Sequence, residues 1–547
     1  MDFDKLILNS RIYPLVNEGE WFEAMALKDG RIAKLFEKEP GNANQIADEV
    51  IDVKGKTIIP GLIDSHFHFM ASAALNEVAL NVSEINTTKN RVEPHTLDGF
   101  RLKLQEFAKT QDPKLPILCF NYIIAAMDED RLPFAKELDK WVPNRYVIVT
   151  SMDGHSSAHS SKSLKYMGFD PHSHNGILTG EDHEFNLGKI NNLVLESLTP
   201  SIIFNSIQNL INDAAHHGIT MIHCLDGFDD LENDKSLWFL TKFGRFLPIE
   251  LRVFPQFLSP KKVEPYVKYM AYKRLGGCGA WEQDGSVGSQ TAAFQESYAN
   301  KENDNGKVYY TYDQMDKFVK NAHSAGYQIT SHAIGPRAID VILHAFQGVI
   351  QEDKKIMGKT NRFRHRIDHF EFPTKEQVDL AIDELNLVIT AQPGYSWMDE
   401  AFQKAYRRYL TPHQYQSQIP LKNIYEKGGI LCGSSDSPVQ HLNPFVQLEG
   451  LVNFPLENEQ LSMFQALRSY TYNGAYSVFE EKLRGTLEPG KIADFIILDK
   501  DPFKISKTDI LDLKVLDTYT KGERFEDWDY GMFKFMGKYL FSKKHKI

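Results

Sequence analysis

Eight short apolar segments, each followed by a longer amphipathic stretch, constrain the fold of this chain more than any other feature. They lie between about Gly61 and Phe479, and their alternation with helical patterns is typical of repeated β–α units around a parallel sheet. The segments are LIDSHFH (from Leu62), ITMIHC (Ile219), LRVFPQF (Leu251), CGAWEQD (Cys278), YQITSH (Tyr327), FRHRIDH (Phe363), LVITAQP (Leu387) and ILCGSSD (Ile430). Eight such strands predict an α/β protein with a (β/α)8 TIM barrel.

Both ends of the chain differ from this middle region. The stretches KLILNSRIYPL and EAMALKDGRIAKLFE near the start, and GTLEPGKIADFIILDKDP and VLDTYTKGERF near the end, alternate short β-rich runs with glycine turns. They predict a small composite β-sandwich from residues 1–60 and 485–547 around a barrel at 61–484. The first two barrel strands are too far apart for a simple crossover, so we expect residues 85–205 to form an insertion over the barrel mouth.

Composition excludes several classes of protein. The formal net charge is −11, so no general basic surface is available for nucleic acid. No stretch approaches 18 consecutive apolar residues, which excludes a membrane span, and the acidic start MDFDKLILNS does not resemble a signal peptide. The 4 cysteines lie far apart and form no CxxC pair, which favours a reducing, cytoplasmic location.

Two histidines at the end of the first strand indicate a metal site. Residues i and i+2 of a strand point to the same face, so His66 and His68 should both face inward. They lie at the carboxyl end of the strand, where barrel active sites are built. His332, His369 and Asp436 also end predicted strands. Imidazoles and a carboxylate that converge from separate strands suit a divalent cation.

A series of motifs extends this pattern to a known family. The stretches, in chain order, are GKTIIPGLIDSHFH, GITMIH, DGSVGSQTAAF, ITSHAIGPRAID, RHRIDHFE, AQPGY, GSSDSPV and LEPGKIADFIILDKDP. They cover nearly the whole chain and resemble the amidohydrolase superfamily, more narrowly its YtcJ-like branch (amidohydrolase family 3), which includes N-substituted formamide deformylases. The resemblance implies a barrel with a small β-sandwich, and metal ligation by His66, His68, His332, His369 and Asp436. Relatives are often dimers, so a homodimer is one of the states open to this chain.

One position departs from the family pattern. Many relatives carry a lysine on strand four that is carboxylated by carbon dioxide and bridges two metal ions. Here that position is Ala280, and no lysine occurs between Lys273 and Lys301. Our hypothesis is that Glu282, two residues further along the strand, supplies the bridging carboxylate. In the alternative, Glu282 forms a salt bridge and the site binds one metal ion instead of two.

The ligand set predicts the chemistry. Histidine and carboxylate ligands suit Zn2+ and tolerate manganese, iron or cobalt. A bound divalent ion lowers the pKa of water from about 15.7 to about 7, which supplies hydroxide at neutral pH. Asp436 would take a proton from the water and pass it to the departing amine. His332 and His369 would hold a second ion, or one of them would stabilise the oxyanion. We therefore predict a metal-dependent hydrolase that cleaves a non-peptide C–N bond in an amide or N-substituted formamide.

Residues near the strand ends supply further candidates for a small-molecule pocket. His155, in the motif DGHSS, is either a substrate contact or oxyanion donor, or a loop-stabilising side chain. Gln290 and Thr291 follow strand four in a glycine-containing loop, and both are candidate substrate contacts. Three aromatic side chains near strand ends would either line the pocket or pack in the core: Trp281, Tyr395 and Trp397.

Four other histidines lack any ligand spacing, and we expect them at the surface: His159, His172, His174 and His183. Two rival functions stay open. Deaminases on this scaffold carry a glutamate three residues after the strand-five histidine, but Gly335 stands there, which argues against deamination. A non-catalytic binding scaffold would typically have lost its metal ligands, whereas this chain lacks only the lysine.

Overall fold

The computed structural model describes residues 2–83, 94–231, 234–358, 360–397 and 400–541. All of the predicted central strands are present, in two parallel sheets with the strand orders β12-β11-β5 and β13-β14-β15-β16-β17. Their bounds are β5 (Leu62–Phe67), β11 (Ile219–Asp226), β12 (Glu250–Pro255), β13 (Arg274–Glu282), β14 (Gln328–Ala333), β15 (Arg366–His369), β16 (Val388–Ala391) and β17 (Ile430–Gly433). The α/β class predicted from the alternation is confirmed.

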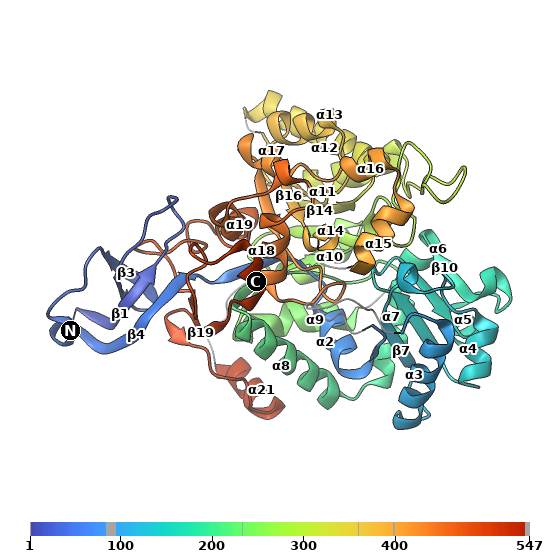
Figure 1. Ribbon diagram of the computed structural model, residues 1–547, viewed down its shortest axis with the longest axis horizontal. Coiled ribbons are helices and arrows are strands. Elements are labelled where there is room, and N and C mark those ends of the chain that lie inside the picture. Colours follow the sequence, from blue (N-terminus) through green and yellow to red (C-terminus); the bar gives the residue numbers. More distant parts are fainter. Residues whose placement is uncertain (1, 84–93, 232–233, 359, 398–399, 542–547) are drawn as a thin grey trace.

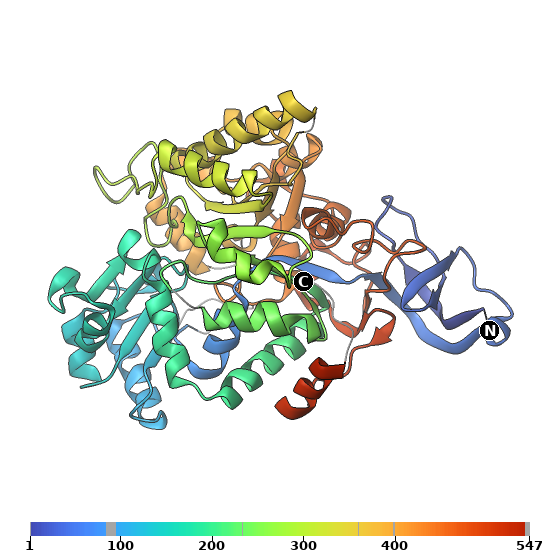
Figure 2. The same ribbon diagram turned by 180° about the vertical axis from the view of Figure 1, so that it is seen from behind.

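Helices connect these strands and cover them on the outside (Figures 1 and 2). β11 is buried along its whole length, as expected for a parallel strand that is covered on both faces. Capping residues fix the helix ends: α12 starts at Pro336 and ends before the left-handed Gly358. The connecting helices are α2 (Phe69–Val78), α8 (Pro200–His216), α9 (Lys235–Phe243), α10 (Pro260–Val267), α11 (Tyr312–Ser324), α12 (Pro336–Met357), α13 (Lys375–Asp379), α17 (Leu421–Glu426), α18 (Pro444–Val452), α19 (Met463–Ser469) and α20 (Tyr472–Ser477).

The hydrogen bonds divide the central strands between two sheets, so a closed barrel is not shown. The two sheets nevertheless approach each other at both ends. β12 lies beside β13, and β17 lies beside β5. A parallel bridge joins Phe67, at the end of β5, to Ser437, just after β17. This junction matters because both sides of it carry predicted metal ligands.

Strands from the two termini form one seven-stranded sheet with the order β20-β19-β18-β4-β1-β2-β3. It lies at one end of the molecule, beside the N-terminus (Figure 1). The two terminal segments therefore pair as expected, while the sandwich arrangement stays a prediction. The strand bounds are β1 (Phe3–Ile12), β2 (Ala24–Lys28), β3 (Arg31–Phe36), β4 (Ala47–Pro60), β18 (Phe495–Leu498), β19 (Val515–Thr520) and β20 (Glu523–Arg524).

The predicted insertion contains a sheet of its own, with the order β10-β9-β8-β7-β6. Its first strand starts at Leu80, ahead of the predicted boundary at 85. It lies at the other end of the molecule from the terminal sheet (Figure 2). The elements are β6 (Leu80–Asn81), β7 (Ile117–Tyr122), β8 (Val147–Ser151), β9 (Ser156–His159) and β10 (Ile177–Thr179), with helices α3 (Leu97–Thr110), α4 (Ala135–Trp141), α5 (Ser161–Met167), α6 (Glu181–Glu184) and α7 (Leu187–Ser197).

The prediction of four surface histidines is wrong for two of them. His172 and His174 are exposed, but His159 and His183 are fully buried. Their burial is possible because the hydroxyl of Ser157 lies 2.7 Å from His159 Nε2 and 2.8 Å from His183 Nδ1. A serine between two imidazoles can accept from one ring and donate to the other, so each neutral ring has a partner at this hydroxyl, while His159 Nδ1 makes no hydrogen bond among the described residues.

We expect the buried His159 to make the protein sensitive to acid. Burial lowers the pKa of His159 to about 3, whereas an unfolded histidine has a pKa near 6.5. The stabilisation is therefore complete above pH 6.5 and is lost as pH falls toward the folded pKa. Between pH 7 and pH 5 this site alone should cost about 2 kcal/mol of unfolding free energy. Urea unfolding of wild type and His159→Gln at both pH values measures the difference, and equal pH slopes would contradict it.

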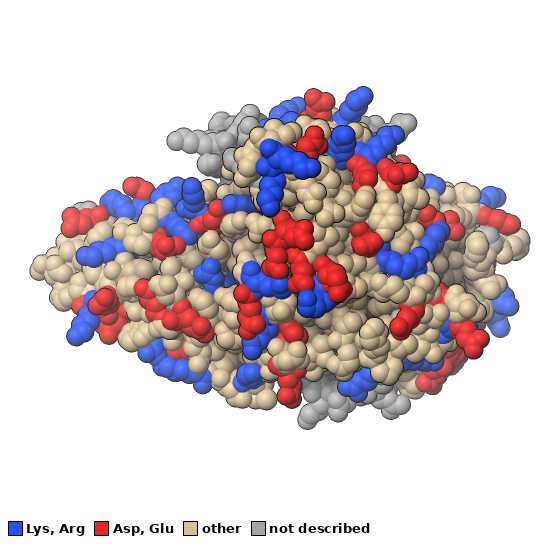
Figure 3. All heavy atoms as spheres, turned by 90° about the horizontal axis from the view of Figure 1, so that it is seen from above, with Lys and Arg blue, Asp and Glu red and all other residues tan. Residues whose placement is uncertain are grey.

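Acidic and basic side chains are interspersed on the face shown in Figure 3, which carries no continuous basic patch of the kind that binds nucleic acid. Within the described ranges, every helix is too short or too polar to cross a bilayer.

Candidate metal centre

The first two predicted ligands lie where β5 gives way to α2. His66 is on the strand, and His68 is the residue before the first turn of the helix. Backbone bonds tie this point to the segment after β17: Asp436 N donates to His66 O (3.0 Å), and His68 N donates to Ser437 O (2.9 Å). Asp436 Oδ1 consequently lies 3.1 Å from His66 Nε2 and 3.2 Å from His68 Nε2. The two imidazoles therefore do converge on one carboxylate oxygen.

The remaining predicted histidines extend this cluster across the carboxyl ends of β14 and β15. The ring centroids of His66 and His369 are 5.0 Å apart, and those of His369 and His332 are 4.4 Å apart. His155, from the insertion, follows at 5.0 Å from His332. Burial lowers the pKa of His369 to about 4 and holds the pKa of His332 well below its ordinary value. Both rings are therefore neutral, which is the form that binds a metal ion.

Acidic residues around His66 favour a positive charge at this point. Burial opposes protonation, but Asp436 and Asp368 together raise the pKa of His66 to about 9. Asp368 Oδ2 lies 3.3 Å from His66 Nδ1, and the other oxygen of this carboxylate, Oδ1, accepts from the buried Arg366. Two carboxylates thus flank one imidazole in a region shielded from water. A divalent cation would meet this demand for positive charge more fully than a proton.

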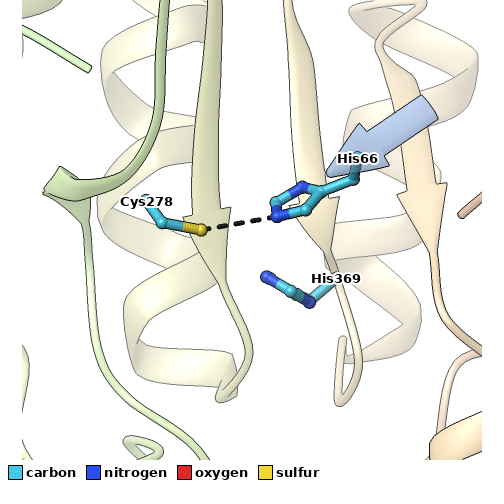
Figure 4. Close-up of side chains that lie close together, drawn as sticks. All are labelled: His66, Cys278 and His369. Atoms are coloured by element: carbon cyan, nitrogen blue, oxygen red, sulfur yellow. Dashed lines mark hydrogen bonds between the residues drawn. The ribbon is translucent and has the colours of Figure 1, made fainter. Parts of the chain in front are cut away.

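Cys278 is a member of the cluster that the sequence did not reveal (Figure 4). Its Sγ lies 3.5 Å from His66 Nε2 and 3.9 Å from His332 Nδ1. Burial raises the pKa of this thiol well above its ordinary value. The side chain is therefore a thiol in isolation and becomes a thiolate only beside a cation.

A bulge in β13 brings Cys278 into the site. Gly277 pairs with Ser331 of β14, yet the next paired residue on β13 is Glu282, opposite His332. An advance of one residue along β14 therefore corresponds to an advance of five residues along β13. Because of this bulge, the alternation of side chains that placed Glu282 on the inward face does not hold. Gly276 and Gly277 have φ of 111° and 125°, a backbone region open to glycine. The sequence signal for the bulge was the run GGCG.

Glu282 lies in the cluster, but on the side of the insertion. It belongs with Glu184 and His155, whose ligand atoms all lie within 4.8 Å of one another. His155 Nδ1 is 2.9 Å from Glu184 Oε1. Burial raises the pKa of Glu184 to about 8, and burial together with the charge of Glu184 raises that of Glu282 well above its usual range. Glu184 had no motif to mark it in the sequence.

The donor atoms fit a metal ion. Among the candidate ligands, four buried atoms make no hydrogen bond within the described ranges: His66 Nδ1, His369 Nε2, Asp436 Oδ1 and Glu282 Oε2. Unpaired buried polar atoms are costly; His66 Nδ1 faces Asp368, and bound cations would satisfy the other three. Four groups of candidate ligands have their donor atoms within 4.8 Å of one another: His66, Cys278 and His369; His66, His68 and Asp436; Cys278, Glu282 and His332; and His155, Glu184 and Glu282.

Side chains behind the ligands orient them. His369 Nδ1 lies 2.8 Å from Gln392 Oε1, and Gln392 Nε2 donates to Ser434 Oγ at the same distance. His68 Nδ1 is 3.1 Å from Leu225 O. These contacts leave the Nε2 atom of each ring toward the cluster, as is usual for metal-binding histidines. Tyr395 OH donates to Asp436 Oδ2 at 2.6 Å, a contact that strand-end reasoning could not supply.

A cavity of about 210 Å³ opens above the cluster, between the central strands and the insertion. The insertion contributes much of its wall, including Leu118, Ile148 and Leu187, while helix α2 contributes Leu75. The ligand side chains form its floor. No lysine or arginine lines the cavity within the described part of the chain. It is therefore an apolar chamber with polar chemistry at one end.

The three predicted substrate contacts do not line this cavity. Trp281 is fully buried in the core, and its indole N–H donates to Phe257 O at 2.9 Å. Gln290 bonds to Asn300, and Thr291 Oγ1 accepts from the backbone N–H of Ser286. Gln290 and Thr291 shape the loop after β13 instead, while Trp281 packs in the core.

Of the other aromatic candidates, Tyr395 reaches the site through Asp436. The side chain of Trp397 lies outside the described part of the structure.

The fold and the histidine–carboxylate cluster together define the class of metal-dependent hydrolases built on parallel α/β strands. Residues 49–525 match the amidohydrolase family, and the chain belongs to that family. The Bacillus subtilis protein YtcJ, which is named as an amidohydrolase, is 23% identical over 94% of this chain and 97% of its own. The N-substituted formamide deformylase of Arthrobacter pascens is also 23% identical, over 95% of this chain and 97% of its own.

Solved structures share the fold. A metal-dependent hydrolase from Pyrococcus horikoshii OT3 superposes with a TM-score of 0.68 at 20% identity, over 92% of this chain and 99% of that one. A Xaa-Pro dipeptidase shares the fold at a TM-score of 0.52 and 13% identity, over 95% and 99% of the two chains. The fold alone therefore does not choose between peptide and non-peptide substrates.

Proposed function

We propose that this protein is a metal-dependent hydrolase of neutral, apolar amides, with N-substituted formamides as the leading substrate class. The observation that carries the proposal is the pairing of a buried ligand cluster with an apolar cavity directly above it. The cluster supplies donors for a cation, and the cavity supplies space for a hydrophobic substituent on the substrate nitrogen.

His66, His68, His369, His332 and Asp436 are the residues that would hold the metal, with Zn2+ the cation best suited to this donor set. A bound divalent ion would supply Lewis acidity toward the amide carbonyl and toward water. The neutral rings of His332 and His369 require no proton loss before they can bind it. The number of ions that bind, one or two, depends on whether a single ion or two ions share these ligands.

Asp436 is the residue we assign to proton transfer. It is the only carboxylate that contacts both His66 and His68 among the described residues, and its second oxygen accepts from Tyr395. A carboxylate held in this way can accept a proton from an attacking water and return it to the departing amine nitrogen. Tyr395 would position the carboxylate, since its hydroxyl donates to Oδ2 while Oδ1 faces His66 and His68.

His155 is placed to contact the substrate. It lines the cavity, lies next to His332 and is anchored through Nδ1 to Glu184. Its Nε2 is therefore the nitrogen available to the cavity. We propose that it donates to the developing oxyanion, with Glu184 as the residue that orients it.

The cavity lining disfavours peptides with a free carboxylate. A dipeptide would bring a carboxylate into an apolar chamber with no basic side chain among its described lining residues. Burying such a charge without a partner costs several kcal/mol. A neutral formamide pays no such penalty, so we expect non-peptide C–N bonds to be preferred.

A substrate panel tests this preference. We expect kcat/KM for a formamide with a bulky apolar N-substituent to exceed that for a Xaa-Pro dipeptide by roughly tenfold or more, since about 1.4 kcal/mol gives a factor of ten. Leu75→Lys, which adds a cation to the cavity wall, should improve the dipeptide relative to the formamide. Faster hydrolysis of the dipeptide by wild type would overturn the assignment, and ammonia release from aminated heterocycles would indicate a deaminase.

We also infer that the eight central strands close into the predicted barrel. The side-by-side placement of β12 with β13 and of β17 with β5, and the bridge from Phe67 to Ser437, support closure. Closure matters for function because it would bring ligands from β5 and from the segment after β17 to the same opening.

A further inference from the structure

We propose that Cys278 is a metal ligand, and that its thiolate is shared between the group that contains His66 and His369 and the group that contains His332 and Glu282. The inference rests on the proposed metal dependence and specifies how this chain achieves it. It replaces our sequence-based hypothesis that Glu282 takes the bridging role.

The distances around Cys278 match those between ligands of one ion. With Zn–S near 2.3 Å and Zn–N near 2.05 Å in a tetrahedral site, the sulfur and nitrogen ligands lie about 3.6 Å apart. The observed separations from Sγ are 3.5 Å to His66 Nε2 and 3.9 Å to His332 Nδ1. Figure 4 shows the sulfur directed at the His66 ring, with His369 beside them.

Cys278 lies between two groups of candidate ligands. Cys278 belongs to one group with His66 and His369, and to another with His332 and Glu282. Glu282 shares groups with His332, His155 and Glu184, on the insertion side of the cluster. The thiol of Cys278 is therefore the donor common to the group with His66 and His369 and to the group with His332 and Glu282. The unpaired, buried atoms His369 Nε2 and Glu282 Oε2 belong to the same two groups, and they independently point to a shared cation.

The backbone is built to hold the thiol at this place. The Cys278 N–H donates to Gln256 Oε1 at 2.9 Å, and Gln256 Nε2 donates in turn to Gly227 O. A side chain at Gly277 would clash with Leu225 at 2.8 Å, and one at Gly276 would clash with the Thr330 backbone at 2.0 Å. The bulge therefore requires glycines before Cys278, and a side-chain amide fixes the cysteine backbone.

X-ray absorption at the zinc edge tests the proposal on the unmodified protein. After loading with zinc, we expect a sulfur shell near 2.3 Å in addition to nitrogen and oxygen neighbours near 2.0–2.1 Å. A shell of nitrogen and oxygen alone, in a protein that holds zinc and hydrolyses amides, would overturn the role of Cys278 and leave the proposed function intact. A protein that binds no zinc would overturn both.

Cobalt substitution of variants gives a second readout. Cobalt bound to a thiolate produces a near-ultraviolet charge-transfer band, which we expect in wild type and in Cys432→Ser. Cys432 is a suitable control because it is buried and bonded to Asn473 O, outside the ligand groups. Cys278→Ser should lose the band, and its zinc affinity should fall by at least about tenfold. A band that persists in Cys278→Ser would contradict the proposal, and the zinc-edge spectrum of wild type decides the matter if this variant does not fold.

Discussion

Asp436→Asn is expected to lower kcat by about 10²–10⁴-fold, the usual contribution of a positioned acid–base group. Asparagine keeps the size of the side chain but cannot take up a proton from water at neutral pH. It can still accept from Tyr395, whose hydroxyl bonds to Oδ2 in the native protein. The fold should therefore survive. Steady-state kinetics with an N-substituted formamide, together with a thermal melt, measures both outcomes.

The matched control for this change is Asp234→Asn. Asp234 is also buried, but it caps helix α9 by accepting from Leu237 N and lies outside the ligand groups. Asparagine is an equally good cap but loses the bond that Asp234 Oδ2 accepts from Phe228 N, so activity should stay close to wild type while stability falls. An Asp436→Asn enzyme with near-normal turnover would remove Asp436 from the mechanism.

The double variant His66→Ala/His68→Ala is expected to lose both bound metal and turnover. These imidazoles supply two nitrogen donors that meet at Asp436, and the remaining ligands come from other strands. Wild type should also gain about 2.7 kcal/mol of stability from zinc at 100 times its dissociation constant, because only the folded state binds the ion. The variant should gain almost none. Metal analysis after dialysis and unfolding with and without zinc provide the measurements.

His172→Ala serves as the control, since His172 is an exposed histidine of the insertion. It should bind metal and turn over substrate as wild type does. Retention of a full metal complement by the double variant would show that the cation sits elsewhere in the protein.

Strand periodicity was enough to predict the central strands and the clustering of histidines and an aspartate at their ends. His66 and His68 lie two residues apart after an apolar run, and that spacing alone placed both rings on one face. His332, His369 and Asp436 could be placed because parallel strands bring their carboxyl ends to one edge. Each of these inferences used local regularity, which a single sequence displays.

The parts that escaped prediction depend on broken regularity or on distant packing. Cys278 enters the site through a bulge that shifts the β13–β14 register, so counting alternate residues from Asp284 selected Glu282 instead. Glu184 comes from the insertion and meets Glu282 only after the chain has folded across nearly a hundred residues of sequence.

The burial of His159 and His183 also depends on packing that a single sequence does not display. His159 and His183 look like surface residues in the sequence because each is flanked by polar neighbours. The hydroxyl of Ser157 bonds to one nitrogen of each ring, and the insertion then covers them. The substrate candidates Trp281, Gln290 and Thr291 lie outside the cavity, whose wall is largely supplied by the insertion, so their role as substrate contacts stays a prediction.

Anomalous X-ray diffraction at the zinc edge, from crystals of the zinc-loaded protein, tests the central claim most directly. The account predicts anomalous density within coordination distance, about 2.0–2.3 Å, of His66, His68 and Asp436, at the floor of the apolar cavity. Zinc density located only away from these side chains, or none in fully loaded protein, would contradict it.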